Sequence, residues 1–298
     1  DARASRKPWR VGFATGLIFK IQRKIMTLIA RSNREARAFS STDKAQVFSG
    51  LKSQIDHIVV VARTLEQGMA WCEATLGITP EMGGEHPQFG THNRLFKIAT
   101  PMFPLAYFEI IAIKNNATNN IAAQSTNTPA SGQNSVKNNR WFDMDDAALQ
   151  AAVAKEPRLV HFVAQTDDIQ AGRTALKALG IDRGPAVEAS RHTRKGRLEW
   201  KITVRDDGQR LFNGALPSLI QWGKTGAAEP LRLHPRNTLP RSGVSLQSVA
   251  VTSPTPEKLQ AAYDAIGLAS VTVAEGAANI TVTLKTPKGL VELQSFGI

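Results

Sequence analysis

Three apolar stretches decide the fold: Ile55–Val61 (IDHIVVV), Leu159–Gln165 (LVHFVAQ) and Ser245–Val251 (SLQSVAV). Each has the length and the apolar, β-branched character that are typical of a strand. Each is followed by a segment with apolar residues at helical spacing, which predicts an amphipathic helix. The predicted helices end at glycines that suit a left-handed C-cap, namely Gly77, Gly180 and Gly267. The sequence therefore contains one structural unit in three tandem copies.

Further strand-like runs follow each predicted helix. In the first copy these runs are NRLFKIA (93–99) and LAYFEIIAI (105–113), and in the second LEWKITV (198–204) and PSLIQWG (217–223). The third copy has NITVTLK (279–285) and LVELQSF (290–296). We therefore predict an α+β fold built from tandem βαβββ units.

Changes in composition divide the chain into six segments. We expect a basic leader (1–50), a first unit (51–114), a flexible insertion poor in large apolar residues (115–139), a helix plus second unit (140–223), a linker rich in Pro and Gly (224–243) and a third unit (244–298). The helix before the second unit has Asp143 as its predicted N-cap.

The formal net charge of +12 is unevenly distributed along the chain. Residues 1–50 carry 11 Lys/Arg and 3 Asp/Glu, a net charge of +8, so the remaining residues carry only +4. The leader matches no targeting class cleanly, and we interpret it as disordered or as an artefact of the start site, with Met26 as the true start. Because the folded part is only mildly basic, we expect no nucleic-acid partner.

The only cysteine, Cys72, lies on the apolar stripe of its predicted helix, so we expect a buried structural thiol and no disulfide within the chain. No apolar run reaches the roughly 18 residues that a membrane helix needs, so we expect no membrane partner. A reducing compartment is permitted, and a cytoplasmic location is the expectation.

Two pairs of polar residues recur at matching places in the first two units. His57 and His161 lie at the same place in the first strand, and Glu109 and Gln221 lie at matching places in the last strand. Such groups are costly to bury in apolar strands unless they have partners. If the units pack about a pseudo-two-fold axis, two imidazoles, a carboxylate and an amide oxygen converge as a credible ligand set for a divalent metal.

These residues, together with the run GGEHPQFGTHNRL (Gly83–Leu95), carry a family resemblance. The sequence resembles the vicinal-oxygen-chelate superfamily, and within it the glyoxalase-like domain proteins. The resemblance implies that units one and two form an open β-cup around a divalent metal (Fe, Zn, Ni or Mn), with a third half-unit appended. It implies His57, Glu109, His161 and Gln221 as the metal ligands. Many members have an acid where this chain has Gln221, which leaves a metal-free site as the alternative.

Residues at the expected cup mouth are candidates for substrate binding. Asn93 and Arg94 follow the turn-rich run and could bind a carbonyl or carboxylate, while Trp200 could line an apolar pocket or pack in the core. The run is equally consistent with a plain connection that leaves His86 and His92 exposed. The basic run RHTRKGR (191–197) has no interleaved aromatic residues, so we interpret it as a solvated hairpin.

Two functions follow from these patterns. The first is a metal-dependent lyase, isomerase or dioxygenase that acts on a small oxygenated substrate, with Glu109 as a catalytic proton acceptor. The alternative is a metal-free protein that binds or sequesters a small molecule. The third unit has Gln247 and Glu292 at the corresponding places but no histidine, so we expect it to be structural, or to form a homodimer.

Overall fold

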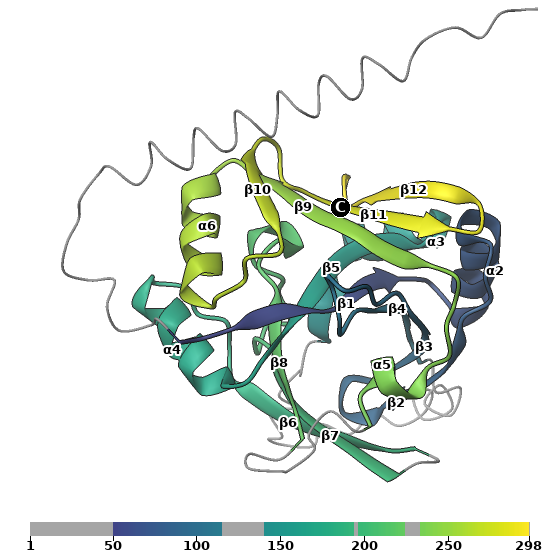
Figure 1. Ribbon diagram of the computed structural model, residues 1–298, viewed down its shortest axis with the longest axis horizontal. Coiled ribbons are helices and arrows are strands. Elements are labelled where there is room, and N and C mark those ends of the chain that lie inside the picture. The colour runs from purple at the N-terminus through teal and green to yellow at the C-terminus, as the bar shows by residue number, and fades with distance from the viewer. Residues whose placement is uncertain (1–49, 115–139, 194–195, 224–232, 298) are drawn as a thin grey trace, which may run out of the picture. The chain divides into compact units, whose positions relative to one another are not determined.

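Strands β1 (Ser53–Val61) and β5 (Arg158–Thr166) lie antiparallel at the centre of the fold (Figure 1). The computed structural model describes residues 50–114, 140–193, 196–223 and 233–297. The predictions for 1–49, 115–139 and 224–232 therefore lie outside the described residues. His57 on β1 pairs with Val163 on β5, and Val59 pairs with His161. This reciprocal pairing places the two histidines symmetrically, as the repeat predicts.

Each half of the chain adds one helix and three strands to this central pair. The first half contributes α2 (Leu65–Leu76), β2 (Glu81–His86), β3 (Thr91–Lys97) and β4 (Tyr107–Ile113). The second half contributes α4 (Ile169–Ala178), β6 (Ala186–Thr193), β7 (Gly196–Thr203) and β8 (Ser218–Trp222). The eight strands form one sheet in the order β2-β3-β4-β1-β5-β8-β7-β6. The α+β class and the two predicted βαβββ units are confirmed.

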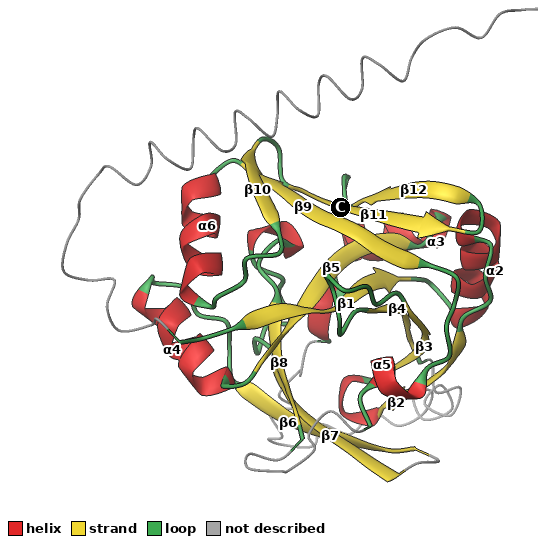
Figure 2. Cartoon of the chain, viewed as in Figure 1, coloured by secondary structure: helices red, strands yellow, loops and turns green. Residues whose placement is uncertain are grey.

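The sheet curls, so that it has an inner and an outer face, each with its own apolar core. The outer core includes Ile58, Val60 and Phe162, and the inner core includes Val59 and Val163. Helices α2 and α4 lie on the outer side (Figure 2). Strands β1 and β5 are buried on both faces, which explains why their sequences are nearly continuous apolar runs.

The predicted helix ends and the predicted thiol agree with the structure, but one predicted cap does not. Gly77 caps α2 in the left-handed region with φ of 76°. Cys72 is buried, and burial raises the pKa of its thiol to about 12. The N-cap of α3 (Ala147–Lys155) is Asp146, which accepts a hydrogen bond from the backbone N–H of Leu149 at 2.8 Å. Asp143, the predicted cap, lies one turn earlier.

The third unit has the predicted element order but a different strand pairing. It consists of β9 (Ser245–Ser253), α6 (Pro256–Ala265), β10 (Thr272–Glu275), β11 (Asn279–Thr286) and β12 (Gly289–Gln294). Its strands form a separate sheet in the order β10-β9-β11-β12. The last strand is therefore not next to the first, as it is in the other two units. Gln247 and Glu292 lie on non-adjacent strands, and both are exposed, so the predicted equivalence with the first unit does not hold.

One face of the third unit packs against the outer face of the eight-stranded sheet (Figure 1). Val249, Val282 and Leu284 belong to the same apolar core as Phe96 and Phe108. This packing covers one face of the small sheet within the chain itself.

A hydrogen bond also joins the third unit to the second. The Tyr263 hydroxyl on α6 donates to the carbonyl oxygen of Ala215 at 2.6 Å, and the side chain is fully buried. Within the described residues, no helix is both long and apolar enough to cross a membrane.

We expect Tyr263→Phe to lower the free energy of unfolding by about 1–2 kcal/mol, because it leaves the buried Ala215 carbonyl without its donor. Urea denaturation followed by circular dichroism would measure this. Replacing the exposed Met82 by alanine is the control and should change stability by less than about 0.5 kcal/mol. Since the third unit shares a core with the sheet, both variants should unfold in one transition; a separate, earlier transition of the third unit would contradict this packing.

Candidate functional site

A β-bulge in β1 places two neighbouring polar side chains on the same side of the sheet. The pairing with β5 shifts between Ile55 and His57, so Asp56 is the extra residue. Adjacent residues of a regular strand point to opposite faces, and a bulge removes that alternation. Asp56 and His57 are both buried, and Asp56 Oδ1 accepts a hydrogen bond from His57 Nδ1 at 2.6 Å.

Asp56 also accepts hydrogen bonds from two other parts of the chain. Trp222 Nε1 on β8 donates at 2.8 Å, and His234 Nε2 donates at 2.9 Å. Burial by itself would raise the pKa of the Asp56 carboxyl, but the charge and hydrogen bond of His234, followed by those of His57, lower it well below its ordinary value. The carboxylate therefore stays ionised and fixes the proton of His57 on Nδ1.

His234 lies in the segment 224–243, which the sequence predicts to be a linker. It is completely buried, and its neighbours form the short helix α5 (Pro235–Thr238). The described part of this segment therefore contributes to the site and does more than connect two units.

The other side of His57 faces the predicted catalytic glutamate. His57 Nε2 lies 3.5 Å from Glu109 Oε2. Glu109 Oε1 accepts a hydrogen bond from Asn93 Nδ2 at 2.5 Å, and Asn93 Oδ1 accepts one from the backbone N–H of Gly84 at 2.7 Å. A Cβ atom at Gly83 would lie 2.0 Å from Asn93 Oδ1, so only glycine lets the Asn93 side chain take this position. His57, Asn93 and Glu109 are thus brought together.

These groups line a small inner pocket within the curled sheet. Its walls are mainly aromatic and aliphatic, and its residues are His57, His86, Asn93, Leu95, Tyr107, Glu109, Trp141, Phe142, Arg191, Trp200, Ile202, Ile220, Trp222 and Pro235. The free space is about 30 Å³. Tyr107 stacks on the His57 ring with 4.6 Å between centroids. Burial, followed by the Asp56 and Glu109 carboxylates, raises the pKa of Tyr107 well above its ordinary value, so the phenol stays protonated.

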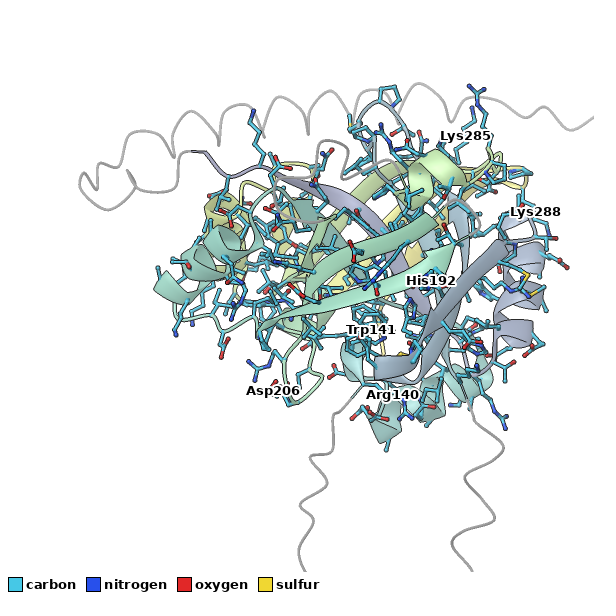
Figure 3. The ribbon with its side chains drawn as sticks, turned by 90° about the horizontal axis from the view of Figure 1, so that it is seen from below. Arg140, Trp141, His192, Asp206, Lys285 and Lys288 are labelled. Atoms are coloured by element: carbon cyan, nitrogen blue, oxygen red, sulfur yellow. The ribbon has the colours of Figure 1, made fainter. Side chains whose placement is uncertain are left out.

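The segment before α3 inserts two aromatic side chains into the interior of the sheet. Trp141 and Phe142 belong to the 3-10 turn η3 (Trp141–Asp143) and are both buried. Figure 3 labels Trp141 and its neighbour Arg140. Phe142 has φ of 61°, a left-handed conformation that costs a non-glycine residue about 1–2 kcal/mol. Asp143 forms an ion pair with Arg210 at 2.9 Å, which helps to hold this turn in place.

His161 does not line the inner pocket, and both of its ring nitrogens form hydrogen bonds to other parts of the chain. Its Nδ1 donates to the carbonyl oxygen of Gly214 at 2.8 Å, and its Nε2 accepts a hydrogen bond from the backbone N–H of Ser218 at 3.0 Å. Phe142 packs over the ring with 5.2 Å between centroids. Burial, and then the nearby charge of Arg183, lower the pKa of His161 well below its ordinary value.

The strand register shows that Gln221 is not the counterpart of Glu109. Val59 on β1 pairs with Glu109 on β4, whereas its symmetry mate on β5, Val163, pairs with Ser218 on β8. The predicted match is therefore off by three residues. Because this offset is odd, Gln221 points to the opposite face, where its Oε1 accepts a hydrogen bond from the backbone N–H of Ile169 at the start of α4, at 3.1 Å.

The predicted four-residue ligand set does not fit a divalent metal. The Nε2 lone pair of His161 already accepts an N–H, and the Arg183 guanidinium lies 3.4 Å from it, where a second cation would be repelled. Gln221 points away, so only His57 and Glu109 share a pocket. Across the described ranges, no group of three or more His, Cys, Asp or Glu side chains is arranged to hold a metal ion.

The predicted substrate-binding residues are placed on different faces. Asn93 and Trp200 line the inner pocket, but Arg94 follows Asn93 in a regular strand and points outward, towards Glu66 on α2. His86, considered above as an exposed loop residue, is buried beside Trp141 with 5.0 Å between ring centroids. The run that contains it forms strand β2 and the turn η2 (Pro87–Phe89) rather than a simple loop.

Several residues of the site were not predicted from the sequence. Tyr107, Trp141, Arg191 and Trp222 line the pocket. Asp56 and His234 do not line it but are hydrogen-bonded to the residues that do, or to each other. The position of Asp56 inside the apolar run IDHIVVV could have indicated its role, because a carboxylate that is buried in a strand requires hydrogen-bond partners. Arg191 was not distinguished from the rest of the basic run 191–197. Its side chain lines the inner pocket, whereas those of Ser190 and His192 are exposed.

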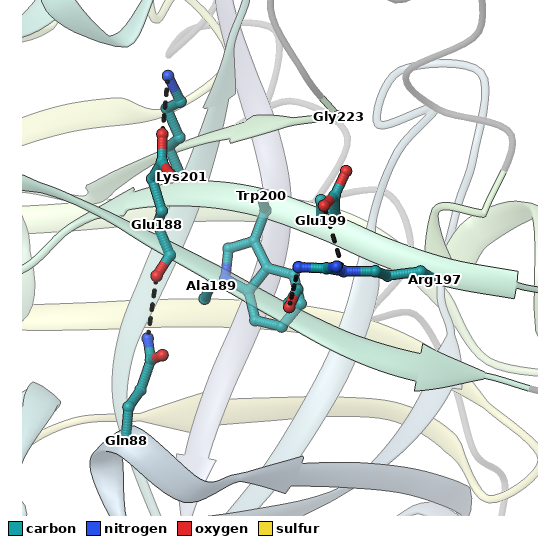
Figure 4. A pocket seen from close by; sticks show the side chains of 9 residues that line it. Gln88, Glu188, Ala189, Arg197, Glu199, Trp200, Lys201 and Gly223 are labelled. Carbon is teal, nitrogen blue, oxygen red and sulfur yellow. Dashed lines mark hydrogen bonds and ion pairs between the residues drawn. The ribbon is translucent and has the colours of Figure 1, made fainter.

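A second pocket of about 350 Å³ lies beside the inner one (Figure 4). Trp200 lines both pockets. The charged side chains of the outer pocket are paired with each other: Arg197 with Glu199 at 3.2 Å, and Lys201 with Glu188 at 3.3 Å. The outer pocket therefore offers space next to Trp200 with its main charges already compensated.

A comparison with family models agrees with this architecture. The model described as "Glyoxalase-like domain" matches residues 55–267. The chain belongs to this family. The match covers the eight-stranded sheet and the beginning of the third unit, and it confirms the resemblance found in the sequence. A search of curated proteins found no match.

Solved structures similar to this glyoxalase-like chain are distant. A hypothetical protein from Staphylococcus aureus has 16% identity and a TM-score of 0.47, with 81% of this chain and 85% of that chain covered. A variant of Streptomyces coelicolor methylmalonyl-CoA epimerase in complex with 2-nitronate-propionyl-CoA has 15% identity and a TM-score of 0.32, with 58% and 98% covered. A mutant of 4-hydroxymandelate synthase from Streptomyces coelicolor has 12% identity and a TM-score of 0.39, with 82% and 63% covered.

We expect His161→Ala to lower the free energy of unfolding by about 2–4 kcal/mol, because it opens a cavity and leaves the Gly214 carbonyl and the Ser218 N–H unpaired. His161→Gln, whose amide offers N–H donors and an acceptor oxygen, should recover part of the loss. Chemical denaturation of both variants would measure the difference. Wild-type stability of His161→Ala would show that this imidazole has no structural role.

The stability of this glyoxalase-like chain should fall on acidification, because two buried imidazoles stay neutral when folded. Burial, and then the charge of Arg191, lower the pKa of His86 from 6.5 to about 3, and the pKa of His161 is also lowered. Above pH 6.5 these imidazoles are mainly neutral in both the folded and the unfolded chain. Below it the unfolded chain binds more protons, so each imidazole lowers the free energy of unfolding by up to about 1.4 kcal/mol per pH unit.

His86→Phe removes one of these two contributions. Urea denaturation at several pH values between 6 and 4.5 should show a slope of stability against pH that is shallower than the wild-type slope by up to about 1.4 kcal/mol per unit. Equal slopes for the variant and the wild type would mean that His86 is protonated in the folded protein.

Proposed function

We propose that the protein binds a small organic molecule in the inner pocket and does so without a divalent metal. The main observation is the difference between the two equivalent histidines. His57 faces the pocket with its Nε2 beside Glu109, whereas both nitrogens of His161 are used to hold β8 and its preceding turn. The second half of a divalent-metal site is therefore replaced by structural hydrogen bonds.

The walls of the pocket support an apolar or aromatic ligand. Trp200 and Trp222 lie 5.7 Å apart between ring centroids, and Phe142, Ile202 and Leu95 complete the apolar lining. Pockets with predominantly apolar walls and a few convergent polar groups are typical of small-molecule sites. Because the free space is only about 30 Å³, a ligand larger than one or two waters requires the side chains to move.

One observation favours a second candidate, an enzyme that transfers protons. Asp56 fixes the His57 proton on Nδ1, so Nε2 and Glu109 Oε2 are two acceptors that face each other at 3.5 Å. An imidazole nitrogen and a carboxylate oxygen at this distance are placed to accept a proton from a ligand that lies beside them. Binding is common to both candidates, and turnover would distinguish them.

The binding function is tested with a neutral aromatic probe. We expect benzamide to bind weakly, with saturation-transfer NMR signals that are reduced at least fivefold in Trp200→Ala, because that variant removes a wall of the pocket. Trp71→Ala is the matched control, since Trp71 lies on the outer face against Phe108. Equal signals in the two variants would rule out this binding site.

Independence from divalent metal is tested by equilibrium dialysis of the full chain against Zn²⁺, Ni²⁺, Mn²⁺ and, without oxygen, Fe²⁺. We expect no stoichiometric binding that His57→Ala abolishes, because His57 and Glu109 supply too few ligands for a stable site. Tight binding of one metal per chain that is lost in both His57→Ala and His161→Ala would contradict the proposal.

A further inference from the structure

The inner pocket is lined by a half-buried cation that forms no ion pair. Arg191 lies on β6 and pairs in register with Leu198 on β7, which belongs to the inner core, so the Arg191 side chain is directed inward. Within the described ranges, no side chain or carbonyl forms a hydrogen bond or ion pair with its guanidinium. The nearby Glu109 carboxylate acts on it only through longer-range attraction.

The backbone of β2 makes room for this side chain. A Cβ atom at Gly84 would lie 2.2 Å from an Arg191 guanidinium nitrogen and 2.9 Å from its Cδ atom. Gly84 therefore lets Arg191 pass close to β2 on its way into the pocket. Removing part of a guanidinium from water costs free energy unless an anion compensates, and no protein carboxylate within the described residues forms an ion pair with half-buried Arg191.

A second unpaired donor lines the same pocket. The Trp141 side chain is 4% exposed, and its Nε1–H is fully buried with no hydrogen-bond partner among the described residues. Buried indole N–H groups usually have an acceptor. By contrast, the N–H of Trp222 in the same pocket is satisfied by Asp56 at 2.8 Å.

We propose that the ligand of the inner pocket carries an anionic oxygen group, of the carboxylate class, which accepts hydrogen bonds from the Arg191 guanidinium and the Trp141 indole N–H. This inference rests on the proposed binding function and specifies its ligand. The rest of such a ligand packs against the aromatic walls. Glu109 and its partner His57 line the same pocket, and beside them a hydroxyl or another donor of the ligand is favoured and a second carboxylate is not.

The test compares two probes of nearly equal shape, benzoate and benzamide, on the full chain. The readouts are isothermal titration calorimetry and the indole N–H signals of ¹⁵N-tryptophan-labelled protein, with the Trp141 signal assigned from Trp141→Phe. We expect benzoate to bind at least tenfold more tightly than benzamide and to shift the Trp141 signal downfield. Arg191→Gln should weaken benzoate binding about 10–100-fold and leave benzamide unchanged. Trp141→Phe, which keeps the ring but removes the donor, should weaken benzoate binding about three- to tenfold.

Arg197→Gln is the matched control, because Arg197 is the next basic residue on the neighbouring strand but is exposed and paired with Glu199. Its benzoate affinity should equal that of the wild type, and a loss like that of Arg191→Gln would show only a general charge effect and overturn the inference. Equal affinities of the wild type for benzoate and benzamide would overturn the inference but keep the binding function. If neither probe binds, the binding function fails as well.

Discussion

The carboxylate of Asp56 on β1 connects this strand with two parts of the chain that are distant from it in sequence. It is fully buried and accepts hydrogen bonds from His57 on β1, Trp222 on β8 and His234 in the segment before the third unit. A buried carboxylate without such donors would be strongly unfavourable, so the two halves of the sheet and the closing segment have to meet there. The same contacts set the tautomer of His57 and the position of the Trp222 ring. The positions of His57 and Trp222, which both line the inner pocket, thus depend on one ionised group.

The symmetry of the fold does not extend to its chemistry. The pairing of β1 with β5 places His57 and His161 in equivalent positions, but their surroundings differ. The strand beside His57 supplies Glu109, which leaves a polar pair that faces free space. The strand beside His161 supplies Ser218 and a backbone N–H, and Arg183 occupies the remaining side. One imidazole is therefore available to a ligand, and the other holds together the second half of the sheet.

The sequence predicts the repeats well because they depend on local patterns. Strand-length apolar runs, helical stripes and left-handed glycines such as Gly77 are all read from neighbouring residues. The site is less predictable, because its residues are selected by register and by long-range contacts. An alignment error of three residues puts Gln221 in place of Ser218 and reverses the face of the strand. The third unit has the same order of elements, yet β11 lies between its first and last strands.

Other site residues carry no local signal at all. His234 lies in a segment rich in proline and glycine, and its burial follows from a bond to a carboxylate 178 residues earlier. Arg191 begins a basic run that reads as a solvated hairpin, but strand alternation directs it inward opposite Leu198. Asp56 changes face because of a bulge, which apolar patterning does not reveal.

The most direct test of this account is the ¹⁵N NMR spectrum of the histidine side chains at neutral pH, recorded before and after one equivalent of Zn²⁺ is added. The structure predicts that the His161 signals correspond to a neutral ring with its proton on Nδ1, and that zinc does not shift them. Movement of the His57 and His161 signals together on addition of zinc would show that both imidazoles bind one metal, and would contradict the account.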